Sequence, residues 1–411
     1  MNQALAAQTD QRFPEAESLY RAALAINPGS FDALHMLGVV CLQLRRPEEA
    51  SELLIAALPL QATDYPPLLQ NLGLCLAAVA KARGINSYSA EGKRQGAAHR
   101  HFFRRNNLPD LAPDPPRVSI VAPCYNHARY VAEALASIKS QTYRNIELII
   151  IDDGSKDDSA TVINGVLADC GIEHRFLQRE NRGADSTLNQ CIELATGHYI
   201  GVLNTDDSYV PERTEYMVRM LQATGARWGF SNVAYMDGQG RSIGYGEQAR
   251  VDALMKGHDA LYRCHAVSEG FPMHNHAVSS GNLFFERSLW QEIGGFEALR
   301  YNHDWAFCLA AILIAEPAYL DEPAYRYRFH PSNTILRSYG HASQESDLIL
   351  SRWHRRPESV TGNNALAAAR ANRRDADFAV MATGAGHLVA RASLLAYATE
   401  LGLGPATISD I

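Results

Sequence analysis

Two different hydrophobic patterns divide the chain. Residues 1–83 are rich in Ala and Leu at helical spacing, which predicts a group of packed helices. From residue 117 onward, short apolar runs alternate with stretches of helical spacing. This alternation is typical of a mainly parallel sheet covered by helices. The expected strands are 118–122, 146–151, 174–177 and 198–203, and the expected helices include 128–141 and 186–195.

The helical part repeats itself at shifts of 34 and 35 positions. Ala16, Tyr20 and Ala23 return as Ala50, Leu54 and Ala57, and Leu34, Leu37 and Gly38 return as Leu69, Leu72 and Gly73. The small residues let antiparallel helices approach closely, and the large ones fill the space between them. This pattern resembles the tetratricopeptide repeat, although Leu34 stands where that family often has Trp. An Ala-rich helical hairpin of another kind is the alternative. A module of so few repeats is poorly stabilised on its own. We therefore expect it to pack on its neighbour or on a second copy of the chain.

Residues 84–116 differ from the parts on either side. They hold a basic run at 93–105 and then prolines at 109, 113, 115 and 116. Proline at this density breaks helices, so this stretch predicts a linker. The basic run is either a solvated connector or a contact for anionic lipid. The expected division is a repeat module at 1–83, a linker at 84–116, an α/β domain at 117–340 and a helical extension without a chemical motif at 341–411.

Composition narrows the possible binding partners and the cellular location of the protein. The formal net charge of −7 argues against broad nucleic-acid binding. Seven cysteines, none in a C-x-x-C pair, suggest a reduced protein and neither a disulfide framework nor a zinc site. The start MNQALAAQTDQRF lacks the features of a signal peptide, and the longest apolar run, 306–315, is too short for a bilayer span. We therefore expect a cytoplasmic protein, with peripheral contact at the inner membrane face left open.

Polar motifs follow three of the predicted strands. They are Pro123-Cys124-Tyr125-Asn126-His127, Asp152-Asp153-Gly154-Ser155 and Asn204-Thr205-Asp206-Asp207-Ser208. In an open α/β sheet, ligands bind beyond the carboxyl ends of the strands, so these motifs should meet at one edge. Several carboxylates at one edge repel each other unless a cation lies among them. A hard divalent cation with phosphate oxygens satisfies that need.

These motifs together resemble the family 2 glycosyltransferases. The resemblance rests on SIVAPCYNHARYVAEALASIKSQTYRNIELIIIDDGSKDDS, NRGADSTLNQCIELATGHYIGVLNTDDSYVPER and IGGFEALRYNHDWAFCL, and it covers roughly residues 117–335. It implies an α/β protein with the GT-A fold, a Rossmann-like mixed sheet flanked by helices. Here the all-α tetratricopeptide-like module precedes that fold.

The resemblance also implies a donor site. Tyr125 would stack on the nucleotide base through its flat ring. Asp153 would accept a hydrogen bond from the base, with Asp152 beside it. Pro123 and Asn126, in the same loop as Tyr125, complete this part of the expected donor site.

The family's DXD motif points to the metal. Asp207 is expected to be a direct ligand of Mn²⁺ or Mg²⁺, with Asp206 binding the ribose or a metal-bound water. Asn204 stands where the family usually has Asp, which leaves fewer charged groups near the metal. Arg328 and His330 lie in the late basic motif YRYRFH. They either close over the diphosphate, or His330 completes the metal site.

Asp304 matches the family's catalytic base. It begins a predicted helix after Gly294-Gly295-Phe296, and His303 stands where the family commonly has Glu. A base opposite the leaving group fits a single displacement with inversion. Trp305 would either line the acceptor site or anchor the helix that presents Asp304.

The resulting hypothesis is a metal-dependent, inverting hexosyl- or N-acetylhexosaminyl-transferase. The donor would be a nucleotide-sugar, with UDP expected as the nucleotide, and the acceptor a protein, a peptide or a glycan. One alternative is a sugar nucleotidyltransferase, but PCYNHARY lacks the Gly-rich basic loop of those enzymes. Another is a catalytically inactive repeat scaffold, favoured only by Asn204.

Overall fold

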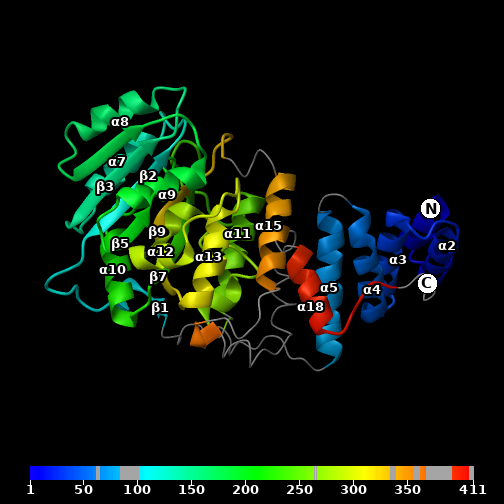
Figure 1. Ribbon diagram of the computed structural model, residues 1–411. Helices are drawn as coiled ribbons and strands as arrows, with labels where there is room; N and C mark the ends of the chain where they lie inside the picture. Colours follow the sequence, from blue (N-terminus) through cyan, green and yellow to red (C-terminus); the bar gives the residue numbers. More distant parts are fainter. Residues whose placement is uncertain are drawn as a thin grey trace.

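The structure is a computed structural model that combines a helical module with an α/β domain (Figure 1). It describes residues 1–61, 65–83, 101–262, 264, 266–333, 339–354, 362–366 and 391–406. Within these residues, no helix is both long enough and apolar enough to cross a membrane.

The N-terminal module is built from antiparallel helices. They are α1 (Asn2–Thr9), α2 (Phe13–Ile26), α3 (Phe31–Gln43), α4 (Pro47–Ala57) and α5 (Pro66–Ala82), with a short 3-10 turn η1 (Leu58–Leu60) after α4. A Cβ placed on Gly38 would lie 2.8 Å from the Leu54 side chain. Glycine therefore lets α3 approach α4 closely, as the repeat pattern predicted.

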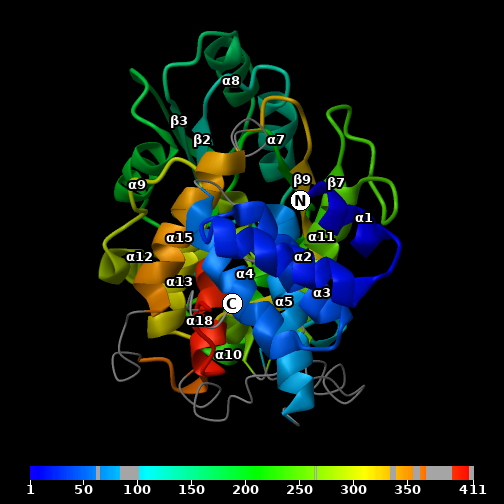
Figure 2. The ribbon, with the colours of Figure 1, turned by 90° about the vertical axis from the view of Figure 1, so that its right-hand side faces the viewer.

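A helix from the far end of the chain packs on this module. Helix α18 (Arg391–Glu400) lies beside α5 (Figures 1 and 2). Its Leu394, Tyr397 and Ala398 belong to the same hydrophobic core as the repeats. The Arg83 guanidinium donates to the carbonyl of Leu401 at 2.6 Å. The C-terminal extension therefore contributes to the core of the repeat module.

The α/β domain contains one mixed sheet. Its strand order is β1-β9-β7-β8-β5-β2-β3-β4, and β6 pairs with β9 off this path. The strands are β1 (Phe102–Phe103), β2 (Val118–Cys124), β3 (Ile146–Asp152), β4 (Glu173–Gln178), β5 (Tyr199–Val202), β6 (Ser208–Tyr209), β7 (Trp228–Met236), β8 (Phe284–Glu286) and β9 (Ala318–Arg328). Strand β8 runs antiparallel to β5 and β7, whereas β2, β3, β4 and β5 pair in parallel.

Helices cover both faces of the sheet. Strand β3 shows why, since Leu148 and Ile150 join one core while Ile149 and Ile151 join the other. The first core lies under α7 (Val131–Lys139), α8 (Ser159–Leu167) and α10 (Arg213–Thr224). The second lies under α9 (Ala184–Leu194), α12 (Arg287–Ile293) and α13 (His303–Ile314). The remaining elements are α11 (Ala249–Leu261), η2 (Arg105–Asn107), η3 (Val267–Gly270) and η4 (Ser280–Asn282).

The predicted fold class, a mixed sheet with flanking helices behind a helical repeat module, is confirmed. The sheet also takes up chain that the sequence assigned to the linker. Phe102 and Phe103 form β1, which pairs in parallel with Tyr319 and Leu320 of β9. The basic residues 93, 94 and 100 of the expected linker lie outside the described part of the chain.

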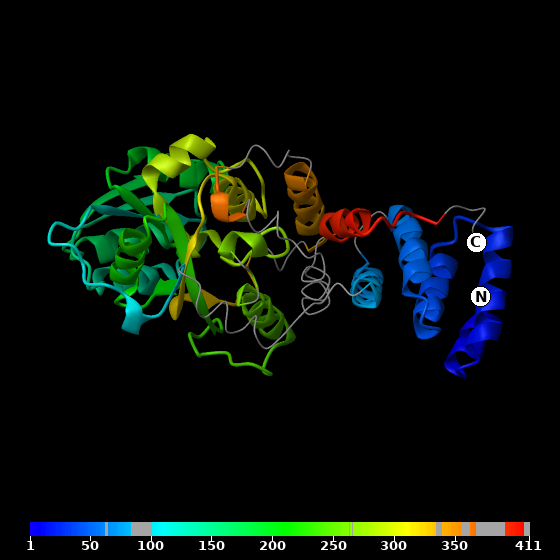
Figure 3. The same ribbon diagram turned by 90° about the horizontal axis from the view of Figure 1, so that it is seen from below.

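The described parts of the C-terminal extension touch both halves of the molecule. Helix α15 (Tyr339–His354) places Ile349, Leu350 and Trp353 in the core of the α/β domain. It also packs against α18, which belongs to the repeat core. Figure 3 shows α15 and α18 between the sheet and the repeats. All seven cysteines are buried free thiols.

Candidate active site

The loops that follow β2 and β3 meet at one edge of the sheet. The backbone N–H of Asn126 donates to Ser155 Oγ at 2.8 Å, and the Asn126 amide oxygen accepts from the Lys156 N–H at 2.7 Å. Asn126 has a φ of 55°, a left-handed conformation that Asn adopts more readily than most residues. Its amide therefore joins the two loops, and its contact with a donor stays a prediction.

His127 connects the first loop to the third. Its Nδ1 lies 2.8 Å from the Thr205 hydroxyl, which donates its own hydrogen to the Pro123 carbonyl at 3.1 Å. The hydroxyl must then accept from Nδ1, because it has only one hydrogen to give. A neutral His127 thus carries its hydrogen on Nδ1 and turns the lone pair of Nε2 toward Asp206. The three motif loops converge, as expected.

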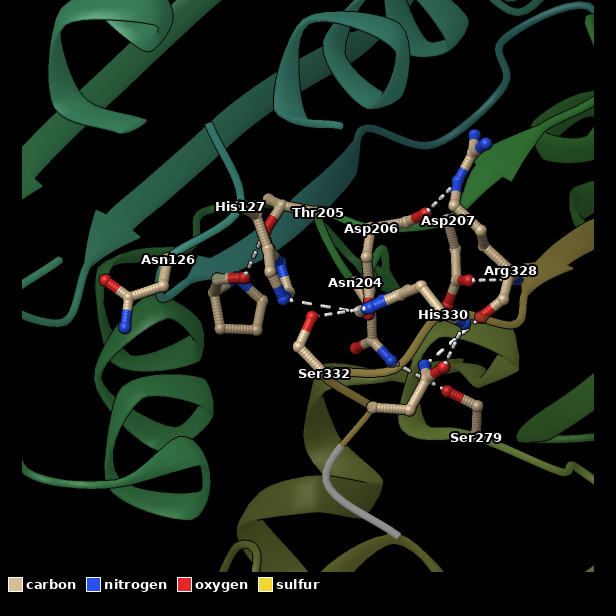
Figure 4. A network of polar contacts seen from close by, with 12 residues as sticks. Asn126, His127, Asn204, Thr205, Asp206, Asp207, Ser279, Arg328, His330 and Ser332 are labelled. Carbon is tan, nitrogen blue, oxygen red and sulfur yellow. Dashed lines mark hydrogen bonds and ion pairs between the residues drawn. The ribbon is translucent and has the colours of Figure 1, made fainter. Parts of the chain in front are cut away.

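Asp206 lies between two imidazoles (Figure 4). Its Oδ2 atom is 3.0 Å from Nε2 of His330 and 3.6 Å from Nε2 of His127. Burial alone raises the pKa of Asp206, but the charge of His127 and the hydrogen bond from His330 together hold this pKa below its ordinary value. A carboxylate oxygen facing two imidazole nitrogens is a set of atoms that suits a divalent transition metal.

Asp207 has a different environment, although it is the next residue. Its Oδ1 accepts from the Arg328 backbone N–H at 2.7 Å, and its Oδ2 accepts from the Tyr325 hydroxyl. The side chain is buried, and that burial, together with the neighbouring Asp206, raises the pKa of Asp207 well above its ordinary value. Both oxygens bind groups of β9, so Asp207 holds this strand at the site.

Asn204 is held by two serines. Its Nδ2 donates to Ser279 Oγ at 2.7 Å, and its Oδ1 accepts from Ser280 Oγ at 3.0 Å. These serines lie at η4, so the amide fixes that turn to the end of β5. Its hydrogen bonds give Asn204 a structural use where the family usually has a carboxylate.

Arg328 is engaged internally. Its Nε donates to the Asp206 carbonyl at 2.8 Å, and its Nη2 lies 2.6 Å from a carboxylate oxygen of Glu133. The guanidinium also lies over the Tyr130 ring, 5.1 Å from its centroid. Figure 4 shows the guanidinium pointing away from His127 and His330. The expected closure of Arg328 over a diphosphate would require it to leave these contacts.

The acidic pair after β3 shapes the second loop. Asp152 accepts from the Ser155 N–H at 3.3 Å, and Asp153 accepts from the backbone N–H groups of Arg182 and Gly183 at 3.0 and 2.9 Å. A Cβ on Gly154 would lie 2.8 Å from the Asn181 nitrogen, so this turn requires glycine. The Oδ1 atoms have second partners, the Ser155 hydroxyl for Asp152 and the Arg179 guanidinium at 3.1 Å for Asp153. Capacity for a ligand therefore lies at the two Oδ2 atoms.

Tyr125 offers an apolar ring surface at this edge of the sheet. It follows directly after β2 and is 43% exposed. A ring with this exposure can stack on a flat ligand without displacing protein contacts from its free face.

Asp304 lies in the first turn of α13. Its Oδ1 accepts from the Trp305 N–H at 2.7 Å, and its Oδ2 accepts from the Asn275 amide at 3.1 Å. Burial raises the pKa of Asp304 above its ordinary value, against the opposing charge of His303. The Trp305 indole donates to the Phe271 carbonyl at 2.7 Å and is buried. Of the two roles considered for Trp305, the structure supports the anchor of the helix.

The backbone that leads into Asp304 is held by the C-terminal extension. Glu345 of α15 accepts hydrogen bonds from three consecutive N–H groups, those of Arg300, Tyr301 and Asn302, at 2.9, 2.8 and 3.0 Å. The Asn302 side chain also donates to the Ala342 carbonyl at 2.7 Å. No chemical role was predicted for the extension, and here it fixes the start of the helix that carries Asp304.

The carboxylates of Asp206, Asp207 and Asp304 all influence the pKa of the Tyr327 phenol. Burial raises the pKa of Tyr327 most, and the negative charges of Asp207, Asp206 and Asp304 raise it further. Tyr327 belongs to β9.

Several residues of this site were not assigned a role from the sequence. His127 could have been found, because it is a metal-ligating residue type in a motif loop. Tyr325 and Ser279 carried no such signal. They reach their partners Asp207 and Asn204 across 118 and 75 positions of sequence, and only the folded chain brings them together.

Two segments of the chain match known families. Residues 119–268 match the model described as glycosyl transferase family 2, and residues 7–72 match a tetratricopeptide repeat model. An uncharacterised glycosyltransferase of Rickettsia felis is 30% identical over 242 residues, which cover 58% of this chain and 38% of the relative. One of Rickettsia prowazekii is 29% identical over 237 residues, covering 57% and 70%. By these matches, the α/β part of the chain is similar to glycosyl transferase family 2 and the helical part to tetratricopeptide repeats.

The chain also resembles solved structures. Staphylococcus aureus TarS 1-349 in complex with UDP-GlcNAc is 15% identical, with a TM-score of 0.45, over 58% of this chain and 66% of that one. The mannosyltransferase PcManGT of Pyrobaculum calidifontis in complex with GDP-Man and Mn²⁺ is 19% identical, with a TM-score of 0.47, over 81% and 98%. The aligned part spans well under half the length of the Rickettsia felis relative.

Proposed function

We propose that the chain transfers a glycosyl group from a nucleotide-sugar to an acceptor hydroxyl, with inversion at the anomeric carbon. The family 2 match supports glycosyl transfer. The observation that carries the proposal is the Asp206 carboxylate after β5, whose Oδ2 lies 3.0 Å from Nε2 of His330 and 3.6 Å from Nε2 of His127. A carboxylate cluster suited to a metal and a separate buried carboxylate are the two parts that such a reaction needs.

Asp206 and His330 are proposed to hold a divalent metal, with His127 as a third ligand or as a partner of Asp206. This assignment moves the direct ligand from Asp207 to Asp206, because Asp206 Oδ2 faces two imidazole nitrogens whereas the Asp207 oxygens face the Tyr325 hydroxyl and the Arg328 N–H. Mixed carboxylate and imidazole atoms favour Mn²⁺ over Mg²⁺, which prefers oxygen ligands. A metal bound there supplies positive charge for the diphosphate leaving group.

Asp304 is proposed to act as the general base. The acceptor oxygen attacks the anomeric carbon, the bond from that carbon to the diphosphate oxygen breaks, and the proton of the acceptor hydroxyl passes to Asp304. Burial raises the pKa of Asp304, which strengthens its ionised form as a base. A single displacement of this kind inverts the anomeric configuration.

The nucleotide is proposed to be UDP. Tyr125 offers an exposed ring for the base, and the carboxylates of Asp152 and Asp153 can each accept the N–H of a uracil edge. The acceptor is proposed to be a hydroxyl of a protein or of a saccharide. The repeat module supports a macromolecular acceptor, since helical repeats often bind peptides.

A panel of nucleotide-sugars tests this proposal. The full chain is incubated with each donor and Mn²⁺, and release of the nucleoside diphosphate is measured with and without EDTA. A UDP-sugar should be consumed, EDTA should stop the reaction, and added Mn²⁺ should restore it. Full activity in a metal-free preparation would exclude the proposed metal, and equal affinity for GDP and UDP in competition calorimetry would exclude the proposed base pocket.

A further inference from the structure

The side chain of Asp304 is held at both oxygens. The Trp305 N–H occupies one oxygen from within the same helix, and the Asn275 amide occupies the other from a different segment. The chemistry fixes the orientation of this amide, because its oxygen would repel the carboxylate while its N–H group is attracted. Asn275 is the member of this pair that can be changed without altering the helix.

We propose that Asn275 is a positioning residue for the general base. It keeps the Asp304 carboxylate in one rotamer and favours its ionised form, so that the free lone pairs face the acceptor hydroxyl. This inference rests on the proposed function, since it assumes that Asp304 accepts the proton. The sequence offers no sign of it, because Asn275 lies in an irregular segment 29 positions before Asp304.

The segment that carries Asn275 is fixed at Phe271 and Met273. The Phe271 carbonyl accepts from the Trp305 indole at 2.7 Å, and Met273 packs into the hydrophobic core of the repeats and α18. The amide is therefore presented to Asp304 by a fixed backbone. Ser268, further back in η3, donates through its hydroxyl to the buried carboxylate of Glu316 and not to this site.

Other groups also act on Asp304. His303 precedes it and its charge lowers the pKa of Asp304, against the effect of burial. Cys308, one turn later on α13, and Tyr327 of β9 are the other titratable groups that interact with it. Within the described residues, Asn275 provides the one hydrogen bond to this carboxylate from a side chain. Removing that bond should therefore make protonation of Asp304 easier without changing a formal charge.

The experiment compares three variants of the full chain by their pH profiles. Asn275→Ala removes the hydrogen bond, and Asn275→Asp keeps the size of the side chain but adds a like charge. Ser268→Ala is the matched control, because it removes a hydrogen bond from the same segment to a carboxylate other than Asp304. For each variant, kcat/KM for transfer is measured across the acid limb of the pH profile, where the rate falls as the pH decreases. UDP affinity is measured at the same pH values.

The acid limb should move to higher pH in Asn275→Ala, and further in Asn275→Asp. On that limb, transfer by Asn275→Ala should fall roughly tenfold to a hundredfold, the usual value of a hydrogen bond to a charged group. UDP affinity and the Ser268→Ala profile should stay unchanged. An unmoved limb in the folded, isosteric Asn275→Asp variant, or an equal shift in Ser268→Ala, would overturn the positioning role. If Asp304→Asn keeps normal transfer, the base assignment itself fails, which separates the two inferences.

Discussion

The chain should lose stability in mild acid, because three histidines are buried together beside the active site. His258 of α11, His274 and His276 are each at least 92% shielded from solvent, at 4%, 8% and 0% exposure. Their rings contact one another, with centroids 5.2 Å apart for His274 and His276 and 6.3 Å for His258 and His276. Within the described part of the chain, neither ring nitrogen of His258 has a hydrogen-bond partner. A charged imidazole in this place would therefore be poorly solvated.

The size of the stability loss follows from the shifted pKa values of the three histidines. Burial lowers the pKa of His258 to about 3 and that of His274 to about 4, and it lowers the pKa of His276 well below its ordinary value. The native state therefore stays neutral here while the unfolded chain takes up protons below about pH 6.5. Stability from this cluster is present above that pH and is lost as the pH falls. Between pH 7 and pH 5, each histidine costs about 2 kcal/mol, so the three together cost about 6 kcal/mol.

Urea unfolding at a series of pH values between 7 and 5 measures this loss directly. His258→Phe keeps a flat ring against Tyr319, where the two ring planes differ by 24°, and should remove about one third of the pH dependence. His174→Gln is the control, since His174 is exposed and should have little effect. A wild-type stability that changes by less than about 2 kcal/mol over this range would refute the reasoning, because even one such histidine accounts for that amount.

Three further substitutions test the active site. Asp304→Asn keeps the shape of the side chain but cannot take a proton, so transfer should fall by roughly 10²–10⁴ while UDP affinity stays within a few-fold; near-normal turnover would remove Asp304 from the mechanism. Asp206→Asn should weaken Mn²⁺ binding, measured by calorimetry, by more than about tenfold. Asp207→Asn should leave Mn²⁺ affinity almost unchanged and lower the melting temperature, because it weakens the contacts to Tyr325 and Arg328. The reverse pattern would restore Asp207 as the direct ligand.

Much of the fold was accessible from the sequence because its signals are local. The buried strand β3 is a continuous apolar run, Ile146 to Ile151, and the motif loops follow such strands directly. Strand β1 was missed because two residues, Phe102 and Phe103, carry no periodicity, and because the surrounding basic and proline-rich residues indicate a linker. Its pairing with β9 depends on contacts across more than 200 positions.

The site was predictable in its location but not in the use of each side chain. Sequence spacing brings Asp206 and Asp207 to one edge of the sheet, yet it treats them alike. In the structure, adjacent residues on a chain point in different directions, so one carboxylate faces His330 and the other faces Tyr325. Which oxygen remains available for a metal depends on partners from β9, more than 100 residues later.

The position of α18 gives the chain an unusual order. Helix α18 packs on α5 and shares its hydrophobic core, and Arg83 bonds to Leu401, 318 positions later. The α/β domain lies between these two helices in sequence. Because α18 also contacts α15, which packs on the α/β domain, packing joins the two units as well as the chain itself. A rearrangement that removed the α/β domain alone would need two breaks in the gene, so the two units are expected to be inherited together.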